Sequence, residues 1–309
     1  MSESTWEGSM ATTKALIADL YEMTKPKVVF LMLITAWVGM ALAPLGAIPW
    51  QAVIMGTLGI AFVAGAGAAF NHILDRQIDQ RMARTQRRPI ATGRISGRVG
   101  LSFATLLTVL GMALLFVYTN ALTAWLTLAS MVGYALVYTA YLKRSTPQNI
   151  VLGGLAGAMP PLLGWTAVTG EVTGLPLLLV LIIFAWTPPH FWALAIHRRD
   201  DYAKANVPMM PVTHGIAFTR IQIWLYSWLL LAVSLLPVAL GASGGVYAIA
   251  ALGLGARFLQ WSYRLLYNKR VDAAWSTFKF SITYLLYLFL ALLVDHFVWP
   301  LIASWMANA

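Results

Sequence analysis

Long apolar stretches alternate with short polar connections along most of this chain. Each stretch is about 20 residues long, which is the length an α-helix needs to cross the hydrocarbon core of a bilayer. The pattern predicts an all-α integral membrane protein with about nine transmembrane helices. These helices are expected at residues 28–48, 52–73, 99–118, 121–141, 149–168, 175–196, 217–240, 243–263 and 277–301.

The same pattern predicts three segments: a cytoplasmic N-terminal segment (1–27), a single nine-helix domain (28–301) and a short C-terminal tail (302–309). Residues 1–23 are polar and mixed in charge. They lack the apolar core of a signal peptide and the arginine-rich, acid-poor composition of a transit peptide. A protein of the bacterial plasma (inner) membrane is therefore expected.

Composition agrees with this picture, because 60% of the residues are hydrophobic and only 10% are charged. A soluble domain carries about 25% charged residues, and a disordered chain carries far less apolar surface. Both classes are excluded. The chain has no cysteine, which also excludes disulfides, catalytic thiols and thiolate-bound metals.

The basic residues lie almost entirely in the N-terminal segment and in the connections after the even-numbered spans, above all in residues 75–98. Connections after odd-numbered spans are nearly neutral. Since basic loops stay in the cytoplasm, the N-terminus is expected inside and the C-terminus outside. The net charge of +10 is thereby explained by membrane orientation, and no nucleic-acid partner is expected.

Asn71, Asp75 and Asp79 recur every four residues where the second span meets the cytoplasm. On a helix this spacing places three oxygen ligands along one stripe. Hard oxygen ligands suit Mg²⁺, which typically joins carboxylates to substrate phosphate. The alternative is a solvated helix end whose acids pair with neighbouring arginines. Arg84 and Arg88 follow at once and have the geometry to grip phosphate oxygens.

Polar residues also close the fourth and sixth spans. His190, His197 and Asp201 lie close to one line on a helix, and the preceding pair Pro188–Pro189 is expected to kink or break that helix. A buried, hydrogen-bonded histidine and an interfacial one are the alternatives for His190 and His197. The pair Lys143–Arg144, after Tyr138, fits either a diphosphate site or an interfacial belt.

At these residues the sequence resembles a known family. The string NHILDRQIDQRMARTQRRP resembles the N-x-x-x-D-x-x-x-D signature of the UbiA-type intramembrane prenyltransferases. The strings YLKRSTPQNIVLGGLAGAMPPLLGW and WTPPHFWALAIHRRDDYAKANVPMMPV are similar to the subfamily of protoheme IX farnesyltransferases, the heme O synthases. The resemblance covers residues 25–215 and implies a UbiA-type helix bundle.

The resemblance implies heme B and farnesyl diphosphate as substrates and Mg²⁺ as the metal ion. Asp75 and Asp79 are then expected to be catalytic. His190 and His197 are expected to supply a base or a ligand of heme iron, and they stand where relatives that prenylate hydroxybenzoate have aspartate. The expected metal ligands are Asn71, Asp75, Asp79 and Asp201, and the expected diphosphate-binding residues are Arg84, Arg88, Lys143 and Arg144. The expected heme and prenyl pocket is formed by His190, Phe191, Trp192, Trp186 and Tyr138.

Two alternatives stay open at this stage. A related prenyltransferase acting on an aromatic or quinone precursor would share the metal site. A membrane transporter often has internal repeats with broken helices, and the Asn71 motif and the span-six motif are faintly parallel. Against it, the charged residues cluster at one membrane face, and Asp295 is the one exception that lies deep elsewhere. Membrane lipid is an expected partner, and a heme A synthase or the assembly of a terminal oxidase would take up the product.

Overall fold

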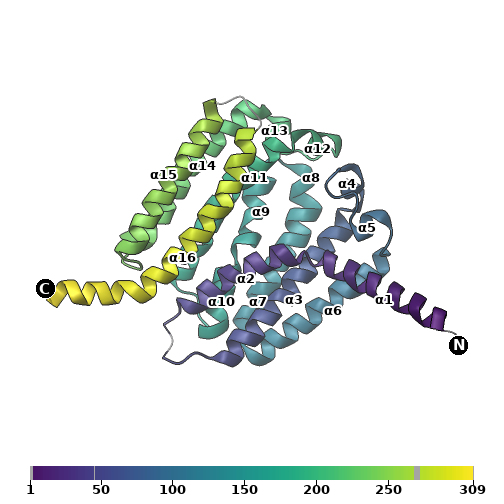
Figure 1. Cartoon of the computed structure of the whole chain (residues 1–309), viewed down its shortest axis with the longest axis horizontal. Coiled ribbons are helices and arrows are strands. Elements are labelled where there is room, and N and C mark those ends of the chain that lie inside the picture. Colours follow the sequence, from purple (N-terminus) through teal and green to yellow (C-terminus); the bar gives the residue numbers. More distant parts are fainter. Residues whose placement is uncertain (1–2, 45, 268–271, 309) are drawn as a thin grey trace.

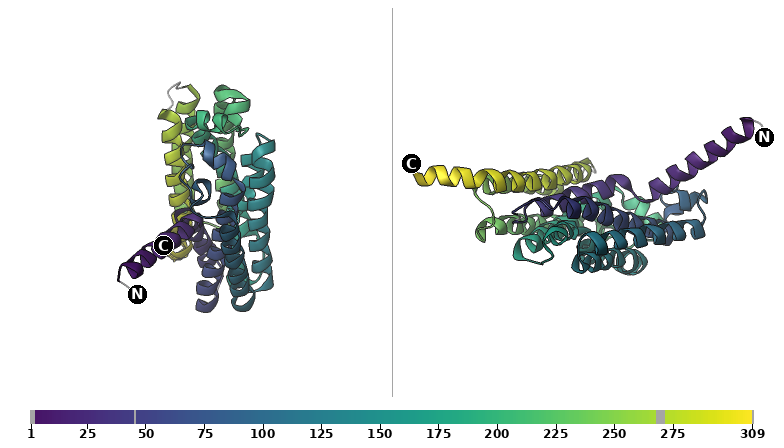
Figure 2. Two further views of the ribbon diagram at one scale, coloured as in Figure 1. Left: turned by 90° about the vertical axis from the view of Figure 1, so that its right-hand side faces the viewer. Right: turned by 90° about the horizontal axis from the view of Figure 1, so that it is seen from below.

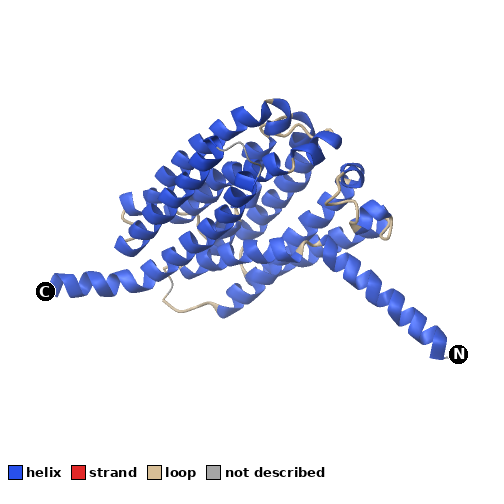
Figure 3. Cartoon of the chain, turned by 45° about the horizontal axis from the view of Figure 1, so that its top comes forward, coloured by secondary structure: helices blue, strands red, loops and turns tan. Residues whose placement is uncertain are grey.

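The computed structural model describes residues 3–44, 46–267 and 272–308, and these form helices joined by loops, with no strand among them (Figure 3). The long elements are α1 (Glu3–Met23), α2 (Pro26–Ala41), α3 (Trp50–Leu74), α6 (Gly97–Tyr118), α7 (Ala121–Val132), the π-helix η1 (Gly133–Leu142), α9 (Asn149–Ala158), α10 (Pro160–Thr169), α11 (Gly174–His197), α14 (Gly215–Ala239), α15 (Gly245–Tyr267) and α16 (Asp272–Asn308). Short helices lie between them: α4 (Arg76–Arg81), α5 (Pro89–Thr92), α8 (Lys143–Ser145), α12 (Arg199–Lys204) and α13 (Met210–Thr213).

The long helices pack side by side in one bundle (Figure 1). The closest pairs are α3 with α6, α2 with α10, α11 with α14, and α15 with both α14 and α16. The short helices α4, α5, α8, α12 and α13 gather in the upper right part of Figure 1, so the predicted polar clusters lie in one region. The two terminal helices, α1 and the last part of α16, project beyond the bundle (Figure 2).

Seven helical segments in the described residues are long and apolar enough to cross a membrane, and α1 and α2, which meet at 47°, make an eighth if counted as one span. This confirms the all-helical membrane fold, with nine spans as an approximate count. Among the predicted spans, α15 is not apolar enough to be counted, because it carries Arg257, Gln260 and Arg264. In the expected C-terminal tail (302–309), the helix α16 continues to Asn308.

The proline pair does not break the helix: α11 runs from Gly174 to His197, with Pro188 and Pro189 inside it. Membrane helices tolerate proline where neighbouring groups satisfy the freed backbone. Here α11 packs against both α14 and α16. The hydroxyl of Thr187 also donates to the Ile183 carbonyl oxygen at 2.8 Å, within the turn that precedes the prolines. Tertiary packing therefore overrides the local preference of the proline pair.

Asp295, the deep acid of the sequence, has a structural role. Its side chain is buried, and its two oxygens accept hydrogen bonds from the backbone N–H groups of Gly244 (2.5 Å) and Tyr247 (2.9 Å). These donors belong to the first turn of α15, where backbone N–H groups lack helical partners. A carboxylate there also suits the helix dipole. Asp295 of α16 thus caps the start of α15.

Helices α2 and α10 approach until their backbones touch. A side chain at Gly164 of α10 would overlap the carbonyl oxygen of Ala36, and one at Gly39 of α2 would overlap that of Pro161. Small residues of this kind allow close contact between membrane helices. This contact holds α2 in position. It therefore also positions the residues just before α2, which belong to the site described below.

We expect Gly164→Ala to destabilise the protein by about 1–3 kcal/mol, the usual cost of overpacking, because its methyl group meets backbone rather than a movable side chain. Gly157→Ala in α9 is the matched control, since nothing lies within 4 Å of its added methyl group. The measurement is the thermal unfolding midpoint in detergent, followed by tryptophan fluorescence. Equal midpoints for the two variants would contradict the close contact.

Candidate active site

The corner between α3 and α4 holds the three residues of the predicted oxygen stripe. The backbone N–H of Asp75 donates to the Asn71 carbonyl oxygen (2.9 Å), and that of Asp79 to the Asp75 carbonyl oxygen (2.8 Å). The helical path therefore continues across the junction and keeps the side chains in line. All three are buried, with exposures of 4% for Asn71, 0% for Asp75 and 2% for Asp79.

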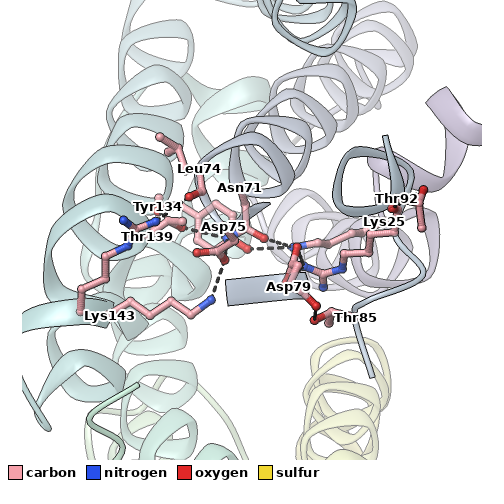
Figure 4. Close-up of polar contacts among 12 residues, drawn as sticks. Lys25, Asn71, Leu74, Asp75, Asp79, Thr85, Thr92, Tyr134, Thr139 and Lys143 are labelled. Carbon is pink, nitrogen blue, oxygen red and sulfur yellow. Dashed lines mark hydrogen bonds and ion pairs between the residues drawn. The ribbon is translucent and has the colours of Figure 1, made fainter. Parts of the chain in front are cut away.

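Cations from elsewhere in the chain neutralise both carboxylates (Figure 4). The Lys143 ammonium lies 2.5 Å from Asp75 Oδ2, which also accepts from the Asn71 amide at 2.7 Å. One guanidinium nitrogen of Arg88 lies 2.9 and 2.8 Å from the two oxygens of Asp79. The structure thus brings together five residues that the sequence predicts for this site.

A sixth residue, Lys25, was counted only as an orientation charge in the sequence. It lies between α1 and α2 in the left-handed conformation (φ 51°). Its ammonium donates to Asn71 Oδ1 at 2.5 Å and to the Tyr134 hydroxyl at 3.3 Å. A non-glycine residue at positive φ is uncommon and persists where surrounding contacts hold it. In the sequence, only the position of Lys25 before Pro26, at the start of a span, could have indicated this role.

The π-helix η1 supplies the wall opposite α3. Thr139 accepts a hydrogen bond from the Asn71 amide at 3.1 Å and donates to the Tyr134 carbonyl oxygen at 2.9 Å, five residues earlier. The wider turn carries Tyr134 and Tyr138, whose rings stack at 5.8 Å. π-Helical turns are frequent at functional sites. Here the turn leads directly into Lys143.

The remaining cations of the sequence prediction lie around this centre. Arg144 donates to the carbonyl oxygen of Leu74 at 2.5 Å, at the end of α3. Arg84 lies near Tyr202 of α12. Burial raises the pKa of Tyr202, and the Arg84 guanidinium opposes that rise. Arg84 therefore links the loop after α4 to the loop after α11.

Asp201 does not contact this centre through any described hydrogen bond or ion pair. Its nearest cation is Arg198, at 3.9 Å on the same loop. Among the described residues no group of three histidine, aspartate or glutamate side chains is arranged around one metal position. A metal role for Asp201 stays a prediction.

The centre nevertheless fits a hard divalent cation. Asp75 Oδ1 is buried without any hydrogen-bond partner, and an unpaired buried carboxylate oxygen is costly. Two carboxylates and one amide oxygen are the donor types that Mg²⁺ takes together with phosphate oxygens. Three cations (Lys25, Arg88 and Lys143) outnumber the two acids, so the surroundings are positive and suit a diphosphate.

The second predicted cluster lies on α11 and faces α16. The ring of His190 stacks on Trp186 (centroids 4.1 Å apart), meets Phe191 edge-on at 4.8 Å and packs on Phe278 at 4.6 Å. Its Nδ1 lies 2.6 Å from the hydroxyl oxygen of Ser281. Three of the predicted pocket residues are therefore in contact.

His197 and Trp192 occupy different surroundings. His197 stacks on Trp275 of α16 at 5.0 Å, and Trp192 turns away from His190 to pack against Tyr226 of α14 at 5.2 Å. The residues that α16 contributes were not predicted: Trp275, Phe278 and Ser281. They form no charged or repeated motif, so only the tertiary fold could identify them.

The chain is similar to known proteins over most of its length. The model of the UbiA prenyltransferase family matches residues 32–293. A protoheme IX farnesyltransferase of Stutzerimonas stutzeri (strain A1501) is 63% identical over 280 residues, covering 91% of this chain and 94% of the relative. Protoheme IX farnesyltransferase 1 of Pseudomonas fluorescens (strain Pf0-1) is 62% identical, covering 92% and 95%.

Solved structures show the same fold. A digeranylgeranylglyceryl phosphate synthase structure has a TM-score of 0.77 at 19% identity and covers 91% of this chain and 98% of its own. A UbiA homolog from Archaeoglobus fulgidus bound to GPP and Mg²⁺ has a TM-score of 0.61 at 14% identity, with 89% and 99% covered.

The fold and the buried, cation-lined carboxylates define an intramembrane prenyltransferase. The chain belongs to the UbiA prenyltransferase family, and its curated relatives at 61–63% identity carry the name protoheme IX farnesyltransferase.

We expect Lys25→Met to slow diphosphate release from a prenyl diphosphate about tenfold, the value of one hydrogen bond to a charged group. The change leaves Asn71 Oδ1 without its donor and removes one of three cations. Lys27→Met, two residues away on the exposed side of α2, is the matched control and should keep full activity. Similar rates of diphosphate release for both variants would show that Lys25 contributes only to the membrane orientation of the protein.

Proposed function

We propose that this protein transfers the farnesyl group of farnesyl diphosphate to a vinyl group of heme B, with addition of water, to give heme O and diphosphate. The observation that carries the proposal is the pair of buried carboxylates, Asp75 and Asp79. Each is paired with a cation, and Asp75 keeps one oxygen without a hydrogen-bond partner. The names of the relatives give the acceptor and donor.

The first task of the site is to stabilise the departing diphosphate. Negative charge grows on its oxygens as the bond to the farnesyl C1 breaks, and preorganised cations lower the energy of that state. Lys25, Arg88 and Lys143 stand at the carboxylates, and Arg84 and Arg144 lie around them. When bound by Asn71, Asp75 and Asp79, with Asp201 as an added ligand, Mg²⁺ would neutralise the same charge.

The second task is to keep water from the allylic cation until the vinyl group attacks. The rings of Trp186, Phe191 and Phe278 surround His190 and give this side of the site an apolar, aromatic lining. Such rings stabilise a cation and exclude water. Water then adds to the vinyl carbon that is left positive, and His190 or His197 takes the proton that this water loses.

Orientation follows from the charges. We place the basic short helices on the cytoplasmic side of the bacterial inner membrane, with the N-terminus inside and the C-terminus outside, by the positive-inside rule. The charged donor then enters from the cytoplasm while its tail lies among the apolar helices. A heme A synthase or a terminal oxidase assembly system would take up the product.

The decisive experiment incubates the purified protein in detergent with heme B, farnesyl diphosphate and Mg²⁺. Extracted heme is then analysed by reversed-phase chromatography with mass detection. We expect a later-eluting heme, heavier by one farnesyl group and one hydroxyl group, that is lost when Mg²⁺ is chelated. Diphosphate release only with an aromatic or quinone acceptor would point to the related prenyltransferase instead.

Asp75→Asn should lower turnover about 100-fold or more, because it removes the free carboxylate oxygen and the partner of Lys143 from the centre of charge stabilisation. The protein should still insert in the membrane. Asp200→Asn is the matched control, since that carboxylate is 87% exposed on α12. Heme O output like that of the unaltered protein from Asp75→Asn would rule out the metal assignment.

A further inference from the structure

Helix α16 places one buried hydroxyl against His190. Ser281 has no exposed surface, and its Oγ lies 2.6 Å from Nδ1 of His190, on a helix 91 residues away in sequence. Either atom of such a pair can be the donor. The direction of the bond decides which nitrogen of the imidazole carries hydrogen.

A second hydrogen bond settles the direction. The Ser281 hydroxyl donates to the carbonyl oxygen of Phe278 at 2.6 Å. A serine hydroxyl has one hydrogen and two lone pairs, so towards His190 it accepts. Nδ1 must therefore carry the hydrogen. In the neutral ring Nε2 then has the lone pair, and no described residue forms a hydrogen bond with it.

Ser281 also fixes the position of the His190 ring. The indole N–H of Trp186 donates to the carbonyl oxygen of Ser281 at 2.7 Å, and Trp186 stacks on His190 with an interplanar angle of 21°. Phe278, one turn earlier on α16, packs on the imidazole as well. The side chain and the backbone of Ser281 thus hold both the tautomer and the plane of His190.

We propose that Ser281 is a positioning residue that keeps His190 in the Nδ1–H tautomer, so that Nε2 acts as the base for water addition. The step rests on the proposed function. The vinyl group forms a bond to the farnesyl C1 while the C1–O bond breaks, and diphosphate leaves with the electron pair. Water then bonds to the vinyl carbon that has become positive, and Nε2 takes the proton that this water loses.

The test compares substitutions at position 281. Ser281→Ala removes the acceptor for Nδ1–H and allows the hydrogen to move to Nε2. We expect kcat to fall at least about tenfold, within the range of general-base catalysis, with an unchanged KM for farnesyl diphosphate. Ser281→Thr keeps the hydroxyl and should retain most activity. Ser281→Cys keeps the volume but accepts weakly, and it should resemble the alanine variant.

Two controls separate positioning from packing. Ser227→Ala in α14 removes a buried hydroxyl whose described hydrogen bond stays within its own helix, to the Ile223 carbonyl oxygen, and should leave kcat unchanged. In a His190→Ala background Ser281→Ala should cause no further loss, since residues that act through each other are not additive. Heme binding, followed by absorbance, should be equal in all variants.

Several results would overturn the proposal. These are an additive loss in the double variant, a cysteine variant as active as the unaltered protein, or a loss of heme binding in Ser281→Ala. If the unaltered protein makes no heme O in the same assay, the proposed function itself fails. An active protein with no response to Ser281→Ala removes only the role of Ser281.

Discussion

The structure depends on the need to neutralise two carboxylates buried at the end of α3. A buried charge without a partner is strongly unfavourable, and removing one partner of a buried pair costs about 3–5 kcal/mol. Lys143 is 68 residues from Asp75, and Arg88 is nine residues from Asp79. Lys25 reaches the neighbouring Asn71 across 46 residues. These contacts join the α1–α2 bend, the end of η1 and the loop before α5 to the end of α3.

The backbone is irregular at two points that bring a cation to this site. Lys25 adopts a left-handed conformation between two helices, and the fourth span changes from an α-helix to a π-helix before Lys143. Both departures bring a lysine to the carboxylate corner. The bundle around them is tightly fixed, as the backbone contact of Gly164 with Ala36 shows. Rigid packing in the membrane thus holds strained segments at the site.

Much of this was predictable, because strong patterns govern it. Apolar stretches of about 20 residues have few alternatives to membrane helices, and the four-residue spacing of Asn71, Asp75 and Asp79 survives the junction of α3 and α4. Lys143 and Arg88 were predicted for this region as diphosphate-binding residues, from the basic motifs beside the acids and from the family resemblance. Their ion pairs with the two carboxylates were not predicted. Helix continuity at Pro188–Pro189 was not predictable, because contacts from α14 and α16 decide it. The role of Asp295 depends on the start of another helix.

The residues of α16 that contact His190 and His197 were the hardest to predict. Trp275, Phe278 and Ser281 are ordinary residues of a membrane helix, and their importance comes only from the packing of α16 against α11. The site then has two chemically different halves. Charged side chains from loops and helix ends surround Asp75 and Asp79, while rings on two packed helices surround the His190 imidazole. This division suits a reaction in which a diphosphate must be stabilised by charge while its carbocation is kept from water.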